Sequence, residues 1–169
     1  MAFTAKDVQA LREKTNVGMM DCKKALTEAD GDMEKAKDIL REKGLATAAK
    51  KAGRIAAEGV IGLYTDGKSS ALVELNCETD FVGNGPEFKA LANQIAKTVV
   101  EAKPADLDAL LATTISEGTV SVADAIQELF LKIRENLKLR RFALVEGTAV
   151  SYIHGGGSVG VLVSFETNA

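Results

Sequence analysis

The N-terminal part of the chain carries apolar side chains at helical spacing, with two interruptions. Thr4 and Asp7 have the spacing of a capping box that starts a helix. The apolar pattern pauses at Thr15-Asn16-Val17-Gly18 and again at Asp30-Gly31-Asp32, which are typical turn sequences. We therefore predict three short helices, the last of which ends at Gly44.

The next segment, 45–57, is rich in alanine and contains Lys50, Lys51 and Arg54, but it has no strong apolar face. This composition predicts a solvent-exposed helical linker. Contact with RNA is an alternative role for these basic side chains together with Arg140 and Arg141. A short basic cluster without interleaved aromatic residues is more often a solvated surface, so we do not predict a specific nucleic acid as partner.

After Glu58 the apolar period changes from helical to two. The turn sequence Thr65-Asp66-Gly67-Lys68 separates two alternating segments, which predicts a β-hairpin with Val73, Leu75 and Cys77 on one face.

Two longer helices are predicted beyond this hairpin. One has Pro86 in its first turn, and the other begins with the capping pattern of Ser121 and Asp124. Their buried stripes are expected to be Phe88, Leu91, Ile95 and Val99, and Ile126, Leu129, Phe130, Ile133 and Leu137. The segment 104–119 has weak helical punctuation and receives no assignment.

An internal repeat organises the second half of the chain. Residues 58–79 align without gaps on 146–167 at a constant offset, so that Tyr64 matches Tyr152 and Val73 matches Val161. We predict a first core subdomain over 58–145 and an incomplete second one over 146–169, preceded by the module 1–44 and the linker. The second hairpin has no helices of its own after it. Its apolar face is then expected to dock on the first sheet or on another chain, which leaves a homodimer open.

Composition excludes several classes of function. The balance of 21 basic and 24 acidic side chains, net −3, lacks the basic excess of a phosphate-backbone binder. Cys22 and Cys77 are expected to be buried free thiols, and His154 has no metal-ligand cluster around it. No nucleophile setting or phosphate-binding loop is present, so we predict neither an enzyme nor a cofactor. The N-terminus has no targeting pattern and no apolar run is long enough to cross a membrane, so the expected location is the cytoplasm.

The segment from Glu78 to Pro86 is predicted to be a loop between a strand and a helix. It stands out because an acidic, an aromatic and a β-branched residue, Asp80, Phe81 and Val82, stand together before two glycines. An exposed Phe81 beside a charge would be the kind of anchor that carries binding energy at a protein interface. Composition leaves open whether Phe81 is exposed or folds back onto the core.

Several motifs resemble bacterial elongation factor Ts, the guanine-nucleotide exchange factor of elongation factor Tu. They are Gly18-Met19-Met20-Asp21-Cys22-Lys23-Lys24-Ala25-Leu26, Glu74-Leu75-Asn76-Cys77-Glu78-Thr79-Asp80-Phe81-Val82, Glu135-Asn136 and Tyr152-Ile153-His154-Gly155. The resemblance covers nearly the whole chain, and the Thr-Asp-Phe-Val run is its most specific part.

The resemblance implies an α+β protein. An N-terminal three-helix module resembling ubiquitin-associated domains is followed by the helical linker and by an antiparallel sheet with packed helices. The hairpin of a truncated second repeat comes last. The family's later helices, projecting coiled coil and C-terminal module are absent from this sequence, which puts full-strength exchange in question.

The resemblance also implies a mechanism without covalent chemistry. Thr79, Asp80, Phe81 and Val82 would bind elongation factor Tu in its GDP-bound and nucleotide-free states. Phe81 would insert between helices of the partner, while Asp80 would perturb the surroundings of its magnesium and phosphate site. Met19, Met20 and His154 would make secondary contacts. The alternative is a helical protein-binding module without exchange activity.

Overall fold

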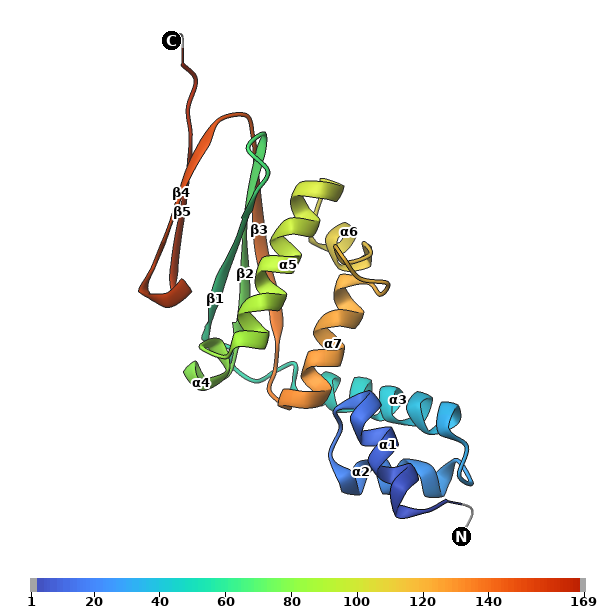
Figure 1. The fold of residues 1–169 in the computed structure, drawn as a ribbon. Coiled ribbons are helices and arrows are strands. Elements are labelled where there is room, and N and C mark those ends of the chain that lie inside the picture. The colour runs from blue at the N-terminus through green and yellow to red at the C-terminus, as the bar shows by residue number, and fades with distance from the viewer. Residues whose placement is uncertain (1–2, 168–169) are drawn as a thin grey trace. The chain divides into compact units, whose positions relative to one another are not determined.

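The structure is a computed structural model that describes residues 3–167. The chain contains helices α1 (Ala5–Thr15), α2 (Met19–Glu28), α3 (Met33–Lys51), α4 (Asp80–Gly83), α5 (Pro86–Ala102), α6 (Leu107–Ala112) and α7 (Val122–Ile133) (Figure 1). Its strands are β1 (Glu58–Thr65), β2 (Ser69–Cys77), β3 (Lys138–Glu146), β4 (Ala149–His154) and β5 (Val159–Ser164), and Gly155–Gly157 form the 3-10 turn η1. The predicted α+β class is therefore confirmed.

The chain divides into two compact units. The first consists of Met1–Gly53 with Gln127–Arg134, and the second of Arg54–Ile126 with Glu135–Ala169.

Helices α1, α2 and α3 form most of the first unit and enclose a small apolar core, against which Leu131 also packs. The capping box is present, because the Thr4 hydroxyl accepts from the Asp7 amide and the Asp7 carboxylate accepts from the Thr4 amide. The core side chains are Val8, Leu11, Val17, Cys22, Ala25, Leu26, Ala29, Ala36 and Leu40. The three predicted helices are confirmed, and Cys22 is a buried free thiol as expected.

The predicted helix end at Gly44 is wrong, because α3 continues to Lys51. A glycine inside a helix costs about 1 kcal/mol relative to alanine, so its presence here needs a packing reason. A Cβ at Gly44 would overlap the side chain of Leu131. Glycine therefore marks a close approach within the first unit, and helical structure covers only the first part of the predicted linker 45–57.

The second unit is built on an antiparallel sheet with the strand order β1-β2-β3. Val73, Leu75 and Cys77 are fully buried on the face that α5 covers, as the period of two predicted. The stripe Phe88, Leu91, Ile95 and Val99 of α5 is buried as well. This part of the fold follows the hydrophobic pattern closely.

Strand β3 was not predicted, and the second long helix is shorter than expected. Leu139 pairs with Leu75 and Arg141 with Glu74, so Arg140 is an extra residue in a β-bulge. The bulge puts two consecutive arginines in the strand and interrupts the alternation of apolar and polar residues by which a strand is predicted. Helix α7 ends at Ile133, so Leu137 lies outside the helix that the apolar stripe predicted.

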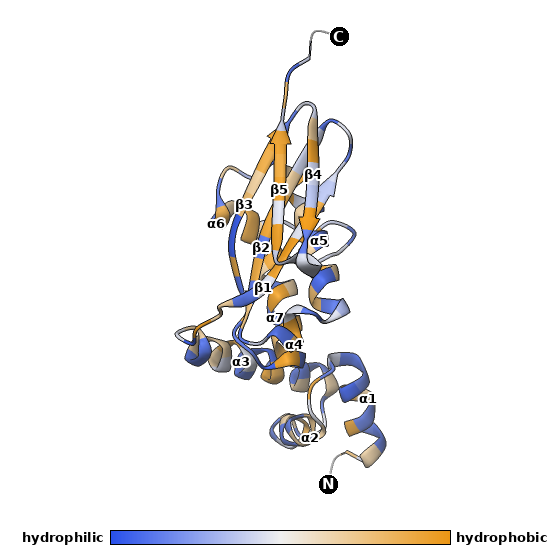
Figure 2. Ribbon diagram, turned by 90° about the vertical axis from the view of Figure 1, so that its left-hand side faces the viewer, coloured by the Kyte–Doolittle hydropathy of each residue, from blue (hydrophilic) through white to orange (hydrophobic). Residues whose placement is uncertain are grey.

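Strands β4 and β5 form the predicted second hairpin, which lies over the face of the first sheet opposite α5 (Figures 1 and 2). Gly160 packs against Ile61, and Gly157 packs against Val60. The hairpin thus docks on the first sheet, which is one of the two expected arrangements. It docks through the face that carries Gly160, however, and the apolar face that was expected to dock, with Val161 and Val163, stays exposed. The pairing differs between the copies, because Tyr64 pairs with Ala71 whereas Tyr152 pairs with Val161 rather than with the equivalent Val159. A shift by two positions keeps every side chain on its face.

Candidate protein-binding site

The Asp80–Phe81 segment is a short helix rather than the loop that the sequence predicted. Helix α4 begins at Asp80, directly after Thr79, whose hydroxyl accepts a hydrogen bond from the Val82 amide at 3.4 Å. Phe81 is 85% exposed, so the side chain points away from the core. An exposed phenylalanine beside a carboxylate on a capped helix is a typical anchor for another protein.

Val82 and Cys77 hold the buried side of this helix against the rest of the second unit. Val82 is only 8% exposed, so its side chain anchors α4 to the second unit and is not a surface group. The Cys77 thiol donates to the Thr79 carbonyl at 3.1 Å. Burial, assisted by the nearby charge of Glu135, raises the pKa of the Cys77 thiol to about 11. Cys77 is therefore a neutral hydrogen-bond donor at physiological pH.

His154 lies at the end of β4, and its ring stacks on Tyr152 with 5.9 Å between the ring centroids. The Tyr152 hydroxyl and His154 Nδ1 are 3.0 Å apart. The turn that follows lies near the end of α4, since a Cβ at Gly156 would be 4.0 Å from Asn84 Oδ1. The second unit thus brings the His154 turn to the same end as Asp80 and Phe81.

Met19 and Met20 form the start of α2 in the first unit and are 44% and 63% exposed. Next to them, Asp21 forms an ion pair with Arg134 Nη2 at 2.9 Å. Two adjacent exposed methionines make a flexible apolar surface that suits contact with a protein.

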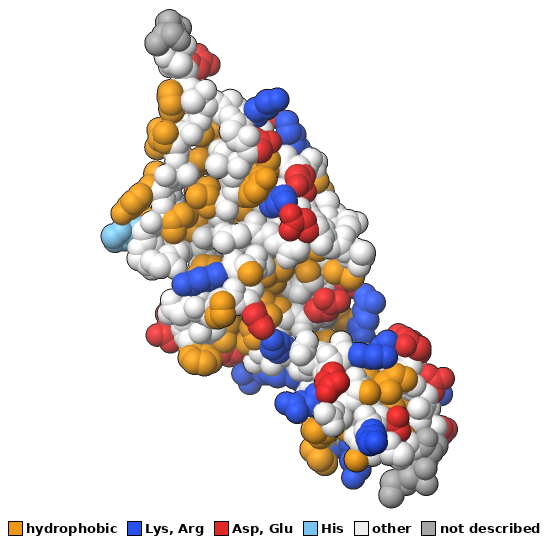
Figure 3. Space-filling model, in the orientation of Figure 1, with side chains coloured by type: hydrophobic (Ala, Val, Ile, Leu, Met, Phe, Trp, Pro, Cys, Tyr) orange, Lys and Arg blue, Asp and Glu red, His pale blue; other side chains and the backbone are white. Residues whose placement is uncertain are grey.

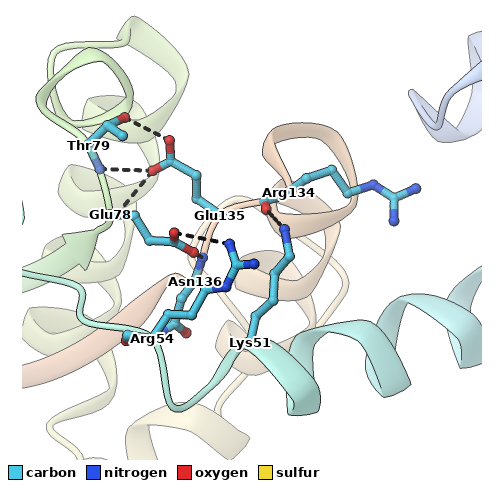
Figure 4. Close-up of polar contacts among 7 residues, drawn as sticks. All are labelled: Lys51, Arg54, Glu78, Thr79, Arg134, Glu135 and Asn136. Carbon is cyan, nitrogen blue, oxygen red and sulfur yellow. Dashed lines mark hydrogen bonds and ion pairs between the residues drawn. The ribbon is translucent and has the colours of Figure 1, made fainter.

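The basic residues considered for RNA contact largely have partners within the protein. Arg141 Nε lies 2.6 Å and Arg140 Nη1 3.7 Å from the Glu74 carboxylate. Arg54 pairs with Glu78 at 3.4 Å, and Lys51 donates to the Arg134 carbonyl (Figure 4). These contacts favour structural roles over a nucleic-acid surface.

The surface of β4 and β5 holds a further apolar group of side chains. Figure 3 shows hydrophobic side chains gathered along this hairpin. We call the set Val150, Tyr152, Val159, Val161, Val163 and Phe165 the hairpin stripe, and each member is at least 44% exposed.

Within residues 3–167, no group of three or more histidine, cysteine or acidic side chains could hold a metal ion. None of the helices described there has the length and apolar character needed to span a bilayer.

Sequence reasoning missed the role of Glu135. Its carboxylate binds the backbone of residues 78 and 79, which are more than fifty positions away. The only sequence signal was the resemblance of Glu135-Asn136 to the family, which carried no role.

The fold and site together define an α+β protein that exposes an acidic and aromatic pair, Asp80 and Phe81, at the start of a short capped helix. Comparison with known proteins makes this class specific. Residues 78–169 match the model of the family described as elongation factor TS. The chain is 50% identical over 172 aligned residues to elongation factor Ts of Clostridium perfringens strain SM101, covering 99% of this chain and 56% of that protein.

Other relatives agree. Elongation factor Ts of Clostridium tetani is 52% identical over 97% of this chain and 56% of its own length. Elongation factor Ts of Clostridium botulinum strain Okra is 52% identical over 95% of this chain and 54% of its own length. The chain belongs to the elongation factor Ts family, and it spans about half the length of these relatives.

Proposed function

We propose that this chain binds elongation factor Tu in its GDP-bound form and promotes release of GDP, so that GTP can bind in its place. Asp80 and Phe81 would enter the partner near its magnesium and phosphate site. The chain would act as an exchange factor without covalent chemistry and would remain bound to the nucleotide-free partner until nucleotide returns.

The exposure of Phe81 carries this proposal. A phenylalanine that is 85% exposed on a helix held by Thr79 and Val82 has no folding role that explains it. Burying one phenylalanine in a partner stabilises the complex by about 1.5 to 3 kcal/mol. Each tenfold loosening of nucleotide requires about 1.4 kcal/mol of coupling. Phe81 alone would thus supply one to two factors of ten.

The remaining effect must come from other groups that favour the nucleotide-free state, since a ligand shifts an equilibrium only by its preference for one state. Asp80 is the first candidate, because it lies next to Phe81 at the start of α4. Its negative charge would compete with the phosphates for magnesium and for the positive groups around them.

The test is stopped-flow release of fluorescent GDP from elongation factor Tu at several concentrations of this chain. Phe81→Ala should slow the maximal rate by about tenfold or more, in line with the burial energy above. Ile55→Ala is the matched control, because it removes another strongly exposed apolar side chain of the second unit and should leave the rate unchanged. Release at the wild-type rate with Phe81→Ala would refute the proposal.

His154 should contribute less than Phe81. Its ring is already stacked on Tyr152, so the partner gains less new contact area from it. His154→Ala should lower the release rate by a smaller factor than Phe81→Ala, and an equal or larger loss would reverse this ranking.

The rival function is a helical binding module without exchange activity, for which exposed Met19 and Met20 are the supporting observation. The two functions separate in one comparison. If the module alone binds, the double variant Met19→Ala, Met20→Ala should abolish binding while Phe81→Ala changes nothing. If exchange is the function, Phe81→Ala should slow GDP release even where binding persists.

A homodimer belongs to the same proposal, with the hairpin stripe as its surface. Self-association would cover the uncharged cross-strand pairs Val150 with Val163 and Tyr152 with Val161. Sedimentation velocity over a range of concentrations tests this directly. A monomer mass at every concentration would exclude the homodimer without affecting the proposed exchange activity.

A further inference from the structure

The carboxylate of Glu135 holds the residues that lead into α4. Its Oε2 accepts hydrogen bonds from the Glu78 amide at 3.1 Å and from the Thr79 amide at 3.0 Å, and its Oε1 accepts from the Thr79 hydroxyl at 2.7 Å (Figure 4). Three bonds from one carboxylate to two consecutive residues fix both their position and their orientation.

The contact is reciprocal between the two segments. Glu78 accepts from the Asn136 amide at 2.7 Å and pairs with Arg54, while the Asn136 side chain donates to the Arg54 carbonyl at 2.8 Å. Residues 78–79 are thus bound to residues 135–136 from both sides (Figure 4). The start of α4 does not depend on a single contact.

Every polar group of Thr79 is used in this arrangement. Its amide and hydroxyl donate to Glu135, its hydroxyl also accepts from the Val82 amide, and its carbonyl accepts from the Gly83 amide and the Cys77 thiol. A helix of four residues has no stability of its own, because helix nucleation is unfavourable. The direction of Asp80 and Phe81 therefore follows from how Thr79 is held.

We propose that Glu135 is a positioning residue for the Asp80 and Phe81 pair, and that it aims this pair at the partner without touching the partner itself. This inference rests on the proposed exchange function. It predicts that loss of the Glu135 contacts mainly lowers the maximal rate of GDP release. The chain concentration that gives half of the maximal rate should change by a smaller factor. The reason is that the binding surfaces remain, whereas the orientation of Asp80 and Phe81 is lost.

Two substitutions of Glu135 separate geometry from charge. In Glu135→Gln the amide oxygen can accept from both backbone amides, and the new NH2 group can donate to the Thr79 hydroxyl, which also accepts hydrogen bonds. Glu135→Ala leaves all three groups to water. Glu101→Ala is the matched control, because Glu101 is a surface carboxylate of α5 with an ion pair to Lys97 at 3.8 Å.

The experiment measures maximal GDP release from elongation factor Tu for the full chain and its variants, with circular dichroism as a folding check. We expect Glu135→Ala to lower the maximal rate on the order of tenfold, whereas Glu135→Gln and Glu101→Ala stay within about twofold of wild type. In the background of the double variant Asp80→Ala, Phe81→Ala, adding Glu135→Ala should change the rate by less than about twofold, since absent side chains cannot be misplaced.

The outcomes distinguish this inference from the proposed function. If Phe81→Ala slows release but Glu135→Ala does not, the positioning role is overturned and the exchange function stands. The same holds if Glu135→Ala slows release by the same factor in the Asp80→Ala, Phe81→Ala background as in the wild type. If Glu135→Gln fails as badly as Glu135→Ala, hydrogen-bond geometry is not the cause. If Phe81→Ala has no effect, the exchange function itself fails.

A second pair of variants covers the case in which Glu135→Ala does not fold. Thr79→Ser keeps the hydroxyl that donates to Glu135 and accepts from Val82, whereas Thr79→Val removes it at similar volume. Thr79→Val should slow release more than Thr79→Ser does. Equal rates for these two variants would overturn the inference.

Discussion

The two hairpins of the internal repeat carry apolar side chains on equivalent faces, but only one of these faces is covered. In β1 and β2, positions such as Val73 and Leu75 are fully buried under α5. Their equivalents in the second copy, Val161 and Val163, are 44% and 49% exposed in the hairpin stripe. The pattern of alternation thus identifies the apolar face of a strand, but it does not say what lies on that face.

Leu75 and Val163 give the strongest test of this difference. Leu75→Ala should destabilise the protein by about 2 to 5 kcal/mol, because it leaves a cavity under α5. Val163→Ala should cost less than about 1 kcal/mol, since the side chain is already half exposed. Urea denaturation followed by circular dichroism measures both. Equal losses would mean that the hairpin stripe is covered in solution.

Cys77 and its equivalent Phe165 test the same difference chemically. Burial raises the pKa of the Cys77 thiol from its ordinary 9.0 to about 11, so its thiolate fraction near pH 8 falls by roughly a hundredfold. Mass spectrometry after iodoacetamide treatment should show slow alkylation of Cys77 and fast alkylation of a cysteine introduced by Phe165→Cys. Rapid alkylation of Cys77 in the folded chain would contradict its burial.

The same pKa shift sets a direction for stability against pH. The folded chain holds the Cys77 proton more tightly than the unfolded chain does, so this contribution is complete below about pH 9. It is lost as the pH rises from there towards about 11. Cys77→Ala should remove that part of the decline, and an unchanged decline in the variant would assign it to other groups.

Gly62 and Val150 occupy equivalent positions in the two copies of the repeat, and α5 packs closely against Gly62. A Cβ at Gly62 would overlap the backbone carbonyl of Ala92, and backbone cannot move aside as a flexible side chain can. Gly62→Val should therefore cost about 1 to 3 kcal/mol. The reverse change, Val150→Gly, should cost about 1 kcal/mol or less, the usual penalty of glycine in a strand. Thermal unfolding of both variants checks the order.

The sequence predicted those parts of the fold where local and tertiary preferences agree. The first hairpin, the capped start of α1 and the buried stripe of α5 follow directly from spacing. Two elements, the end of α3 and strand β3, were not predicted correctly because tertiary contacts outweighed the local pattern. Gly44 marks a close contact with Leu131 instead of a helix end, and the bulge at Arg140 hid β3.

The sequence singled out the residues of the candidate site, but it did not give their geometry. Composition left the direction of Phe81 open, and the structure resolves it through the cap at Thr79 and the burial of Val82. Glu135 could not be identified from the sequence, because its carboxylate accepts hydrogen bonds from backbone amides. Nearly every residue type has a backbone amide, so the side-chain types of the partners give no indication of the contact. Such contacts depend on the fold bringing distant segments together.

Val73 and Val161 are also equivalent positions in the two copies, and the smallest effect on stability is expected for a substitution of Val161. Val161→Lys should change the free energy of unfolding by about 0.5 kcal/mol or less, because a half-exposed position lets the ammonium group reach water. Val73→Lys would bury a charge without a partner and should prevent folding. If Val161→Lys proves strongly destabilising, and the loss grows with protein concentration, the hairpin stripe is an interface between copies of the chain. A small loss that is independent of concentration means that the stripe is open to solvent, and that coverage by α5 is what separates the two copies.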